Sequence, residues 1–182
     1  MTNKEKILGS ALKLFAKQGI DKTSTTQIAT EVGLSSGAPF AHFKTKQELV
    51  DTIYLEIKRD IYASLSKSLS DSESAENNIK VMLRGMVAHF LSNYDAFVFM
   101  TMIEVDPQVS EKALDAWQKE FSGAREMMKT WIKKEEIKNI EADLIPIFLW
   151  SNSLMLIKYC HAKKLKKASD VMLDLVWEGI KK

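Results

Sequence analysis

The chain has 182 residues, which is enough to bury a substantial core without support from a disulfide or a metal. Its single cysteine, Cys160, excludes an intramolecular disulfide and a metal site built from several cysteines. The net charge of +2 is too small to indicate a nucleic-acid-binding protein, but residues 1–50 hold seven lysines against four acidic residues, so the N-terminal part is the basic one.

The first two predicted elements are short helices. Apolar side chains recur at three- and four-residue spacing over residues 4–18, and Gly19 follows as a typical helix-ending residue. Ser24 and Gln27 have the spacing of a capping box, in which each side chain accepts a hydrogen bond from the other residue's amide. We therefore predict a second helix over residues 25–32, ended by another glycine.

A third, shorter helix is predicted over residues 36–42, because Ser35 is a good N-cap. Pro39 falls near its first turn, where the missing amide costs little. Three short helices, the last two joined by a tight turn, form the arrangement that places one exposed helix in the major groove of DNA. Side chains expected to pack inside this head are Leu12, Phe15, Ile28, Ala29, Val32, Leu34, Phe40 and Phe43.

A long helix is predicted over residues 45–69, because Thr45 and Glu48 form a second capping pair and apolar residues then recur every four positions. A polar run starting at Ser70 separates this helix from an apolar-rich region. Further helices are predicted over residues 76–92, 95–104, 108–134, 141–162 and 168–181. We therefore expect an all-α protein with a three-helix helix-turn-helix DNA-binding head, residues 1–46, and a larger helical body, residues 47–182.

Contacts with DNA phosphates are expected at two helix N-termini, which offer free amides and a partial positive charge. Thr25 and Thr26 begin the second helix, and Lys46 lies in the first turn of the long helix. The third helix carries no Arg or Lys, so base reading would rest on small polar side chains, a histidine and contacts with thymine methyl groups. The predicted DNA-binding residues are Thr25, Thr26, Ser35, Ser36, Gly37, Ala38, Phe40, His42, Lys44, Thr45 and Lys46.

Residues 4–50 resemble the tetracycline-repressor (TetR/AcrR) family of bacterial regulators. The resemblance rests on Ala11, Phe15, Gly19, Ile28, Ala29, the run Gly33-Leu34-Ser35-Ser36-Gly37, Phe40, His42, Phe43, Lys46 and Leu49. It implies a homodimer that binds a palindromic operator, commonly as a repressor, and a divergent body whose ligand loosens DNA binding. The family usually has tyrosine at the position of Phe40, so the resemblance implies that a phosphate-binding hydroxyl is lost here while the packing role is kept.

The predicted body is rich in methionine and aromatic residues, which form ordinary cores but also line adaptable pockets. Candidate ligand-binding residues are Met86, His89, Phe90, Phe97, Met100, Trp117, Phe121 and Met128. A body filled solid is the alternative, and the protein would then be a ligand-independent DNA-binding or partner-docking protein. The two readings differ in whether the body holds a cavity.

The last two predicted helices carry more apolar surface than one face of a small body needs. Pairing them with a second copy of the chain would form a four-helix interface, whereas the alternative buries them in the core of a monomer. Cys160 and His161 are adjacent on a helix and point in different directions, which favours a structural cysteine. The lysine run at residues 163–167 is typical of a solvated helix end.

Enzyme chemistry is not indicated, because the chain has no Ser/His/Asp or Cys/His motif, no phosphate-binding glycine loop and no cluster with metal-ligand spacing. We therefore expect no cofactor and no metal. The longest apolar stretch, residues 144–159, is interrupted by polar residues and falls short of the roughly 20 residues that a bilayer requires. The expected partners are double-stranded operator DNA, a small-molecule effector and a second copy of the chain, with no membrane and a cytoplasmic location.

Overall fold

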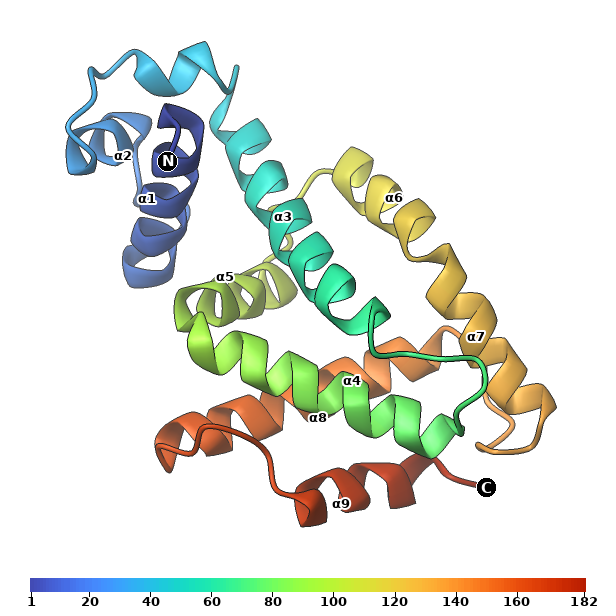
Figure 1. Cartoon of the computed structure of the whole chain (residues 1–182). Coiled ribbons are helices and arrows are strands. Elements are labelled where there is room, and N and C mark those ends of the chain that lie inside the picture. The colour runs from blue at the N-terminus through green and yellow to red at the C-terminus, as the bar shows by residue number, and fades with distance from the viewer. The chain divides into compact units, whose positions relative to one another are not determined.

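The computed structural model describes residues 1–182, and its regular elements are all helical (Figure 1). In chain order they are α1 Asn3–Gln18, α2 Thr25–Glu31, the 3-10 helix η1 Ala38–Ala41, α3 Lys46–Ser66, α4 Ala75–Ser92, α5 Tyr94–Val105, α6 Glu111–Glu120, α7 Ser122–Lys133, α8 Leu144–Ala162 and α9 Asp170–Ile180. The predicted all-α fold class is confirmed. None of these helices combines the length and apolar composition of a membrane span.

The chain divides into two compact units, and each contains two separate stretches of sequence. The first unit comprises residues 1–58 and 93–117, and the second comprises residues 59–92 and 118–182. Helices α5 and α6 thus contribute to the unit that contains the N-terminal helices.

The core of the first unit forms where α1 packs against α2 and α5. Ile7 and Phe15 are fully buried on one face of α1, as the apolar periodicity predicts. The ring of Phe15 stacks on that of Phe99 in α5, with centroids 6.1 Å apart. The buried Ser10 hydroxyl donates to the carbonyl of Ile28, so the polar group on this face of α1 is satisfied by α2.

The ends of α1 and α2 follow local sequence signals. Gly19 ends α1 with φ of 90°, a conformation that a Cβ would disfavour. The predicted capping box at α2 is confirmed, because Ser24 Oγ accepts from the Gln27 amide and Gln27 accepts from the Ser24 amide. A second capping box, between Thr2 and Glu5, begins α1.

The prediction of a helix over residues 36–42 is wrong, because this segment forms only the short 3-10 helix η1. Its bonds run from the amides of Phe40 and His42 to carbonyls three residues earlier. Pro39 has no amide to donate, and Gly37, two residues before it, is a poor helix former. The expected packing of Phe40 is also wrong, since its side chain is 55% exposed while Pro39 is buried.

In the second unit, α4 packs against both α8 and α9. Leu83 and Phe90 of α4 are fully buried, and the Phe90 ring meets that of Trp150 in α8 edge-on, with centroids 5.6 Å apart. Asn78, also fully buried, bonds through its side chain to both backbone groups of Ser70. This amide therefore holds the loop before α4 against the helix.

The prediction of one helix over residues 108–134 is wrong, because the segment forms α6 and α7 with Phe121 between them. The Phe121 ring lies 6.1 Å from that of Tyr62 in an edge-on arrangement. Ser122 and Gly123, which follow Phe121, are poor helix formers. The helix therefore has little propensity to continue past Phe121, and it is interrupted at the residue that contacts Tyr62.

Candidate nucleic-acid interface

All of the predicted DNA-contact residues lie in the first unit. Exposed side chains or backbone are found at Thr26, Ser35, Ser36, Gly37, Phe40, His42, Lys44 and Thr45. Thr25, Ala38 and Lys46 are half-buried. They come from the start of α2, the turn and 3-10 helix that follow it, and the start of α3. The predicted residues thus share one unit and are accessible on it.

The N-terminus of α2 has free donors. The capping box satisfies the amides of Ser24 and Gln27, at 2.8 and 3.1 Å. The amides of Thr25 and Thr26 belong to the first turn and have no acceptor within the helix. Together with the threonine hydroxyls and the helix dipole, they form a group that can bind an anion such as a phosphate.

The segment around η1 presents small and apolar groups. Its backbone is held by bonds from the Ala38 amide to the Ser35 carbonyl, at 2.9 Å, and from the Phe43 amide to the Pro39 carbonyl, at 2.8 Å. Phe43 is buried below the segment, and Phe40 and His42 are exposed on it. This surface can make apolar and single hydrogen-bond contacts with base edges, but it lacks the bidentate guanidinium that favours guanine.

The N-terminus of α3 is tied by two side chains. Thr45 Oγ1 accepts from the Glu48 amide at 3.1 Å, as the predicted pair requires, and the Glu48 carboxylate accepts from the Lys44 amide at 2.7 Å. Lys46 Nζ lies 3.5 Å from the Asp21 carbonyl oxygen, a long and weak bond. The Lys46 ammonium is therefore available to a stronger acceptor such as a phosphate.

A polar network that sequence reasoning missed joins this end of α3 to the segment between α5 and α6. Asp51 accepts from the Ser110 amide at 2.9 Å and from its hydroxyl at 2.6 Å. Gln47 donates to Asp51 and to the carbonyl of Gln108, at 2.9 and 2.8 Å. Ser110 in turn accepts from the amide of Ala113 and so caps α6. No local sequence signal reveals a contact across 59 residues of chain.

The predicted ligand-binding residues are divided between the two units. Phe97, Met100 and Trp117 lie in the first unit. Met86, His89, Phe90, Phe121 and Met128 lie in the second. A common cavity among them stays a prediction.

His89 has a feature typical of a ligand contact. Its Nε2 atom is buried and has no hydrogen-bond partner. Burial lowers the pKa of this imidazole, and the charge of Asp60 opposes that effect. The side chain is therefore held in its neutral form with one polar atom unsatisfied.

Lys58, in the first unit, was not predicted as a functional residue. Its ammonium lies over the rings of Tyr54 and Trp117, 5.7 and 5.4 Å from their centroids. Burial lowers the pKa of Lys58 to about 8, although the charge of Glu104 raises it. A lysine with a perturbed pKa beside a predicted ligand residue is a further candidate for a binding role.

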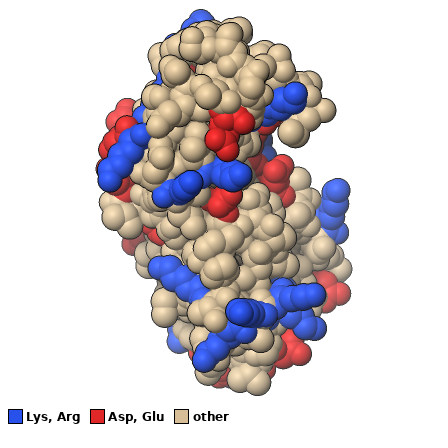
Figure 2. Space-filling view, turned by 90° about the vertical axis from the view of Figure 1, so that its left-hand side faces the viewer, with Lys and Arg blue, Asp and Glu red and all other residues tan.

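Charge is dispersed over the face shown in Figure 2, where Lys and Arg side chains form several separate groups among uncharged and acidic residues. This agrees with the net charge of +2 and indicates that any DNA contact depends on a few placed cations and helix ends.

Comparison with known proteins identifies the N-terminal segment. Residues 7–53 match the model of a family described as bacterial regulatory proteins, tetR family. The uncharacterized HTH-type transcriptional regulator YerO of Bacillus subtilis (strain 168) is 27% identical over 111 residues, which cover 59% of this chain and 38% of YerO. An HTH-type transcriptional regulator of Staphylococcus aureus (strain USA300) is 31% identical over 80 residues, covering 44% of this chain and 42% of that protein. The chain thus spans about two fifths of the length of these curated relatives.

Solved structures share the fold over the whole chain. A tetR-family protein from Shewanella sp. PV-4 has a TM-score of 0.88 at 22% identity and covers 100% of both chains. A TetR-family transcription regulator from Marinobacter aquaeolei VT8 has a TM-score of 0.87 at 13% identity, covering 98% of this chain and 95% of the other. At such identities the likeness concerns the fold.

Proposed function

Residues 7–53 make this chain a member of the tetR family of bacterial regulatory proteins, and from that premise we propose that it is a ligand-responsive repressor. It binds a palindromic operator as a homodimer in the cytoplasm, and a small apolar or amphipathic molecule releases it. The observation that carries the proposal is the accessible set of helix N-termini and small side chains within the matched segment.

DNA binding follows from the chemistry of that segment. The N-termini of α2 and α3 supply amides, hydroxyls and the Lys46 ammonium to phosphates, which position the protein without selecting a sequence. The η1 surface faces the base edges. With no arginine there, Phe40 and Ala38 contact thymine methyl groups, and the deformability of the DNA adds to specificity.

Dimerisation is supported by an apolar surface on α8 and α9. Its exposed side chains are Leu144, Ile147, Met155, Tyr159, Val171 and Leu175. Several of them recur at four-residue spacing, so they lie along one face of each helix. Two copies joined through these helices bury that face in a four-helix interface and bring two heads together.

Effector binding is supported in the second unit by the unsatisfied Nε2 atom of His89, and separately in the first unit by the perturbed Lys58. An unsatisfied buried polar atom costs about 1–3 kcal/mol, which a ligand's hydrogen bond would recover. The apolar residues around these positions in the sequence suit an effector with a large apolar part.

Coupling between effector and DNA would run through the segment between α5 and α6. Asp51 bonds to the residue that caps α6, and Gln47, the residue directly after Lys46, bonds to the same segment. A shift of α6 would therefore displace the start of α3. Two heads must sit about 34 to 36 Å apart to enter successive major grooves, so a displacement of α3 weakens operator binding. A coupling free energy of about 1 to 3 kcal/mol between effector and DNA is enough to alter operator occupancy.

The experiment that tests the proposal is selection of bound DNA from a random duplex pool by the full chain at two salt concentrations. The variant is Lys46→Ala, and the control is Lys133→Ala, an exposed lysine of α7. We expect the parent and the control to enrich the same palindrome. Lys46→Ala should bind every sequence more weakly, with a salt slope reduced by about one unit.

Failure to enrich any palindrome would contradict operator binding by a dimer. Equal loss of binding in Lys133→Ala would contradict the specific role of Lys46 and point to a general electrostatic effect.

A further inference from the structure

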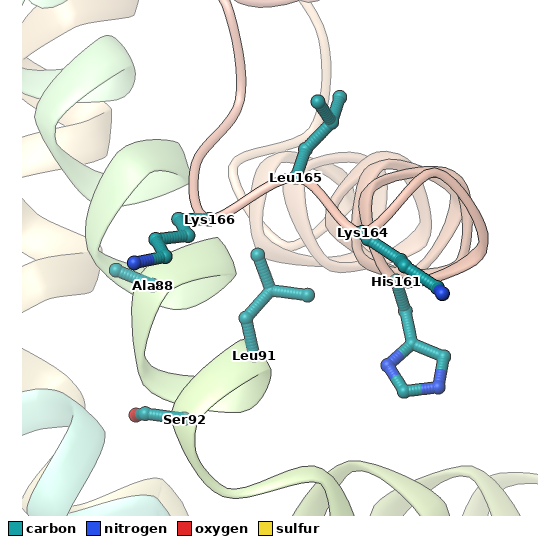
Figure 3. A pocket seen from close by; sticks show the side chains of 7 residues that line it. All are labelled: Ala88, Leu91, Ser92, His161, Lys164, Leu165 and Lys166. Atoms are coloured by element: carbon teal, nitrogen blue, oxygen red, sulfur yellow. The ribbon is translucent and has the colours of Figure 1, made fainter.

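A surface pocket in the second unit is lined by none of the residues considered so far for DNA or effector binding. One side is formed by the end of α4, through Ala88, Leu91 and Ser92, and the other by the turn after α8 (Figure 3). The end of α8 contributes His161, and the turn contributes Lys164, Leu165 and Lys166. The volume of about 400 Å³ lies within the range typical of small-molecule sites.

The turn that forms one wall is held at both ends. The Leu165 amide donates to the Cys160 carbonyl at 2.8 Å, and the Lys164 amide donates to the His161 carbonyl at 3.0 Å. Cys160 is fully buried, and its thiol lies 3.7 Å from the Lys167 carbonyl. The wall is therefore preformed and does not need to be ordered by a ligand.

Lys164 has φ of 55°, in the left-handed region that residues with a Cβ rarely adopt. Glycine is the usual residue at this position after a helix, so a lysine here is kept at a conformational cost. Figure 3 shows its side chain running from the turn away from Leu91.

The pocket has an apolar floor and a cationic rim. Figure 3 shows Leu91 pointing from α4 toward the turn, with Lys166 to one side of it and Lys164 to the other. Leu165 is 41% exposed and adds apolar surface. None of the lining residues is acidic.

The pocket lysines are not neutralised by neighbouring acids. Neither Lys164 nor Lys166 takes part in an ion pair or a side-chain hydrogen bond. The closest acidic residue along the chain, Asp170, forms an ion pair with Arg84 at 2.7 Å. The lysine of this turn whose charge lowers the pKa of Asp170 is Lys167, which lies outside the pocket. The charges of the two pocket lysines are thus uncompensated, and Figure 3 shows their ammonium groups on opposite sides of Leu91.

We propose that this pocket binds a small organic acid with an apolar tail. The tail lies on Leu91, Ala88 and Leu165, and the carboxylate accepts hydrogen bonds from the ammonium groups of Lys164 and Lys166. Lysine stems are flexible and carry rotatable donors, so rotation of the two side chains from their positions in Figure 3 brings both ammonium groups to one carboxylate. The apolar floor disfavours a bare inorganic anion, and the cationic rim disfavours an uncharged amphiphile.

The test is calorimetric titration of the full chain with octanoate, with octanol and inorganic phosphate as comparison ligands. The variant is Lys164→Ala with Lys166→Ala, and the matched control is Lys163→Ala, a lysine of the same turn outside the pocket. We expect saturable octanoate binding, weakened at least tenfold in the double variant and unchanged in the control. Octanol and phosphate should bind at least tenfold more weakly than octanoate. Circular dichroism checks that each variant is folded.

Methyl NMR spectra locate the bound acid, and shifts of the Leu91 and Leu165 signals on addition of octanoate are the expected result. The proposal is overturned by absence of saturable binding, by equal binding of octanol, or by an undiminished affinity in the double variant. Shifts confined to methyl groups elsewhere in the chain would also overturn it, because the acid would then occupy a different site.

Discussion

Among single residues, Phe40 departs from its predicted role. Expected in the core, it is more than half exposed, while the neighbouring Pro39 is buried. The 3-10 geometry of η1 explains the difference, because it turns by about 120° per residue and rotates each side chain away from its α-helical direction. An aromatic ring is thereby placed on the surface proposed to meet DNA.

His89 leads to a prediction about pH. Burial lowers its pKa below the ordinary value near 6.5, so the unfolded chain binds the proton more readily than the folded one. The contribution to stability is present above pH 6.5 and is lost as the pH falls toward the lower folded pKa. We expect His89→Gln to reduce the loss of unfolding free energy between pH 7.5 and 5.5, measured by urea denaturation.

A His89→Gln profile parallel to that of the parent would contradict the link between burial and protonation.

Among the helices, α4 depends on a buried polar side chain at its start. The Asn78 side chain bonds to the amide of Ser70 at 3.1 Å and to its carbonyl at 2.9 Å. Asn78→Ala leaves these groups unsatisfied and should lower the free energy of unfolding by about 1–3 kcal/mol in denaturant titrations. The neighbouring Asn77→Ala removes only an exposed bond to Glu73 and should change stability by less than about 0.5 kcal/mol. Equal effects of the two substitutions would refute the role given to Asn78.

The contact between α3 and the start of α6 has a consequence for DNA binding, if the proposed function holds. Asp51→Ala removes both acceptors of Ser110, so amides in the first turn of α6 should exchange hydrogen faster. Operator affinity should fall by about fivefold or more, the lower end of typical coupling between sites. Thr52→Ala is the control, because Thr52 bonds only within α3.

Hydrogen exchange tests the contact itself, and operator affinity tests its proposed role. Faster exchange with unchanged affinity would show that the contact is structural and does not position α3 for DNA.

For the molecule as a whole, the property to measure is the oligomeric state, because it tests whether a second copy covers the apolar surface of α8 and α9. Met155 and Leu175 are 69% and 70% exposed, which leaves large apolar side chains in water unless a partner covers them. We expect the parent to sediment as a dimer and the variant Met155→Glu with Leu175→Glu to sediment as a monomer. Val105→Glu, at an 87% exposed apolar residue of α5, should remain dimeric. A monomeric parent would sink the dimer proposal.

The all-α class and the ends of several helices were determined by the sequence itself. The Ser24 and Gln27 pair, the glycine after α1 and the apolar periodicity act within a few residues of chain, so local chemistry suffices to predict their outcome. The match of residues 7–53 to the family model likewise depends on residues that are close together in the sequence, so the sequence suffices to detect it.

Only the tertiary structure decided which distant segments share a unit. The break between α6 and α7 occurs at Phe121, whose ring contacts that of Tyr62. Helices α5 and α6 contribute to the unit that contains the N-terminal helices. There α1 packs on α5, and Asp51 bonds to Ser110. The acid-binding pocket proposed here likewise combines the end of α4 with a turn more than a hundred residues from the head. Such contacts depend on which pairs of distant surfaces bury each other most completely. The sequence pattern of a single segment does not predict which surface that segment will contact.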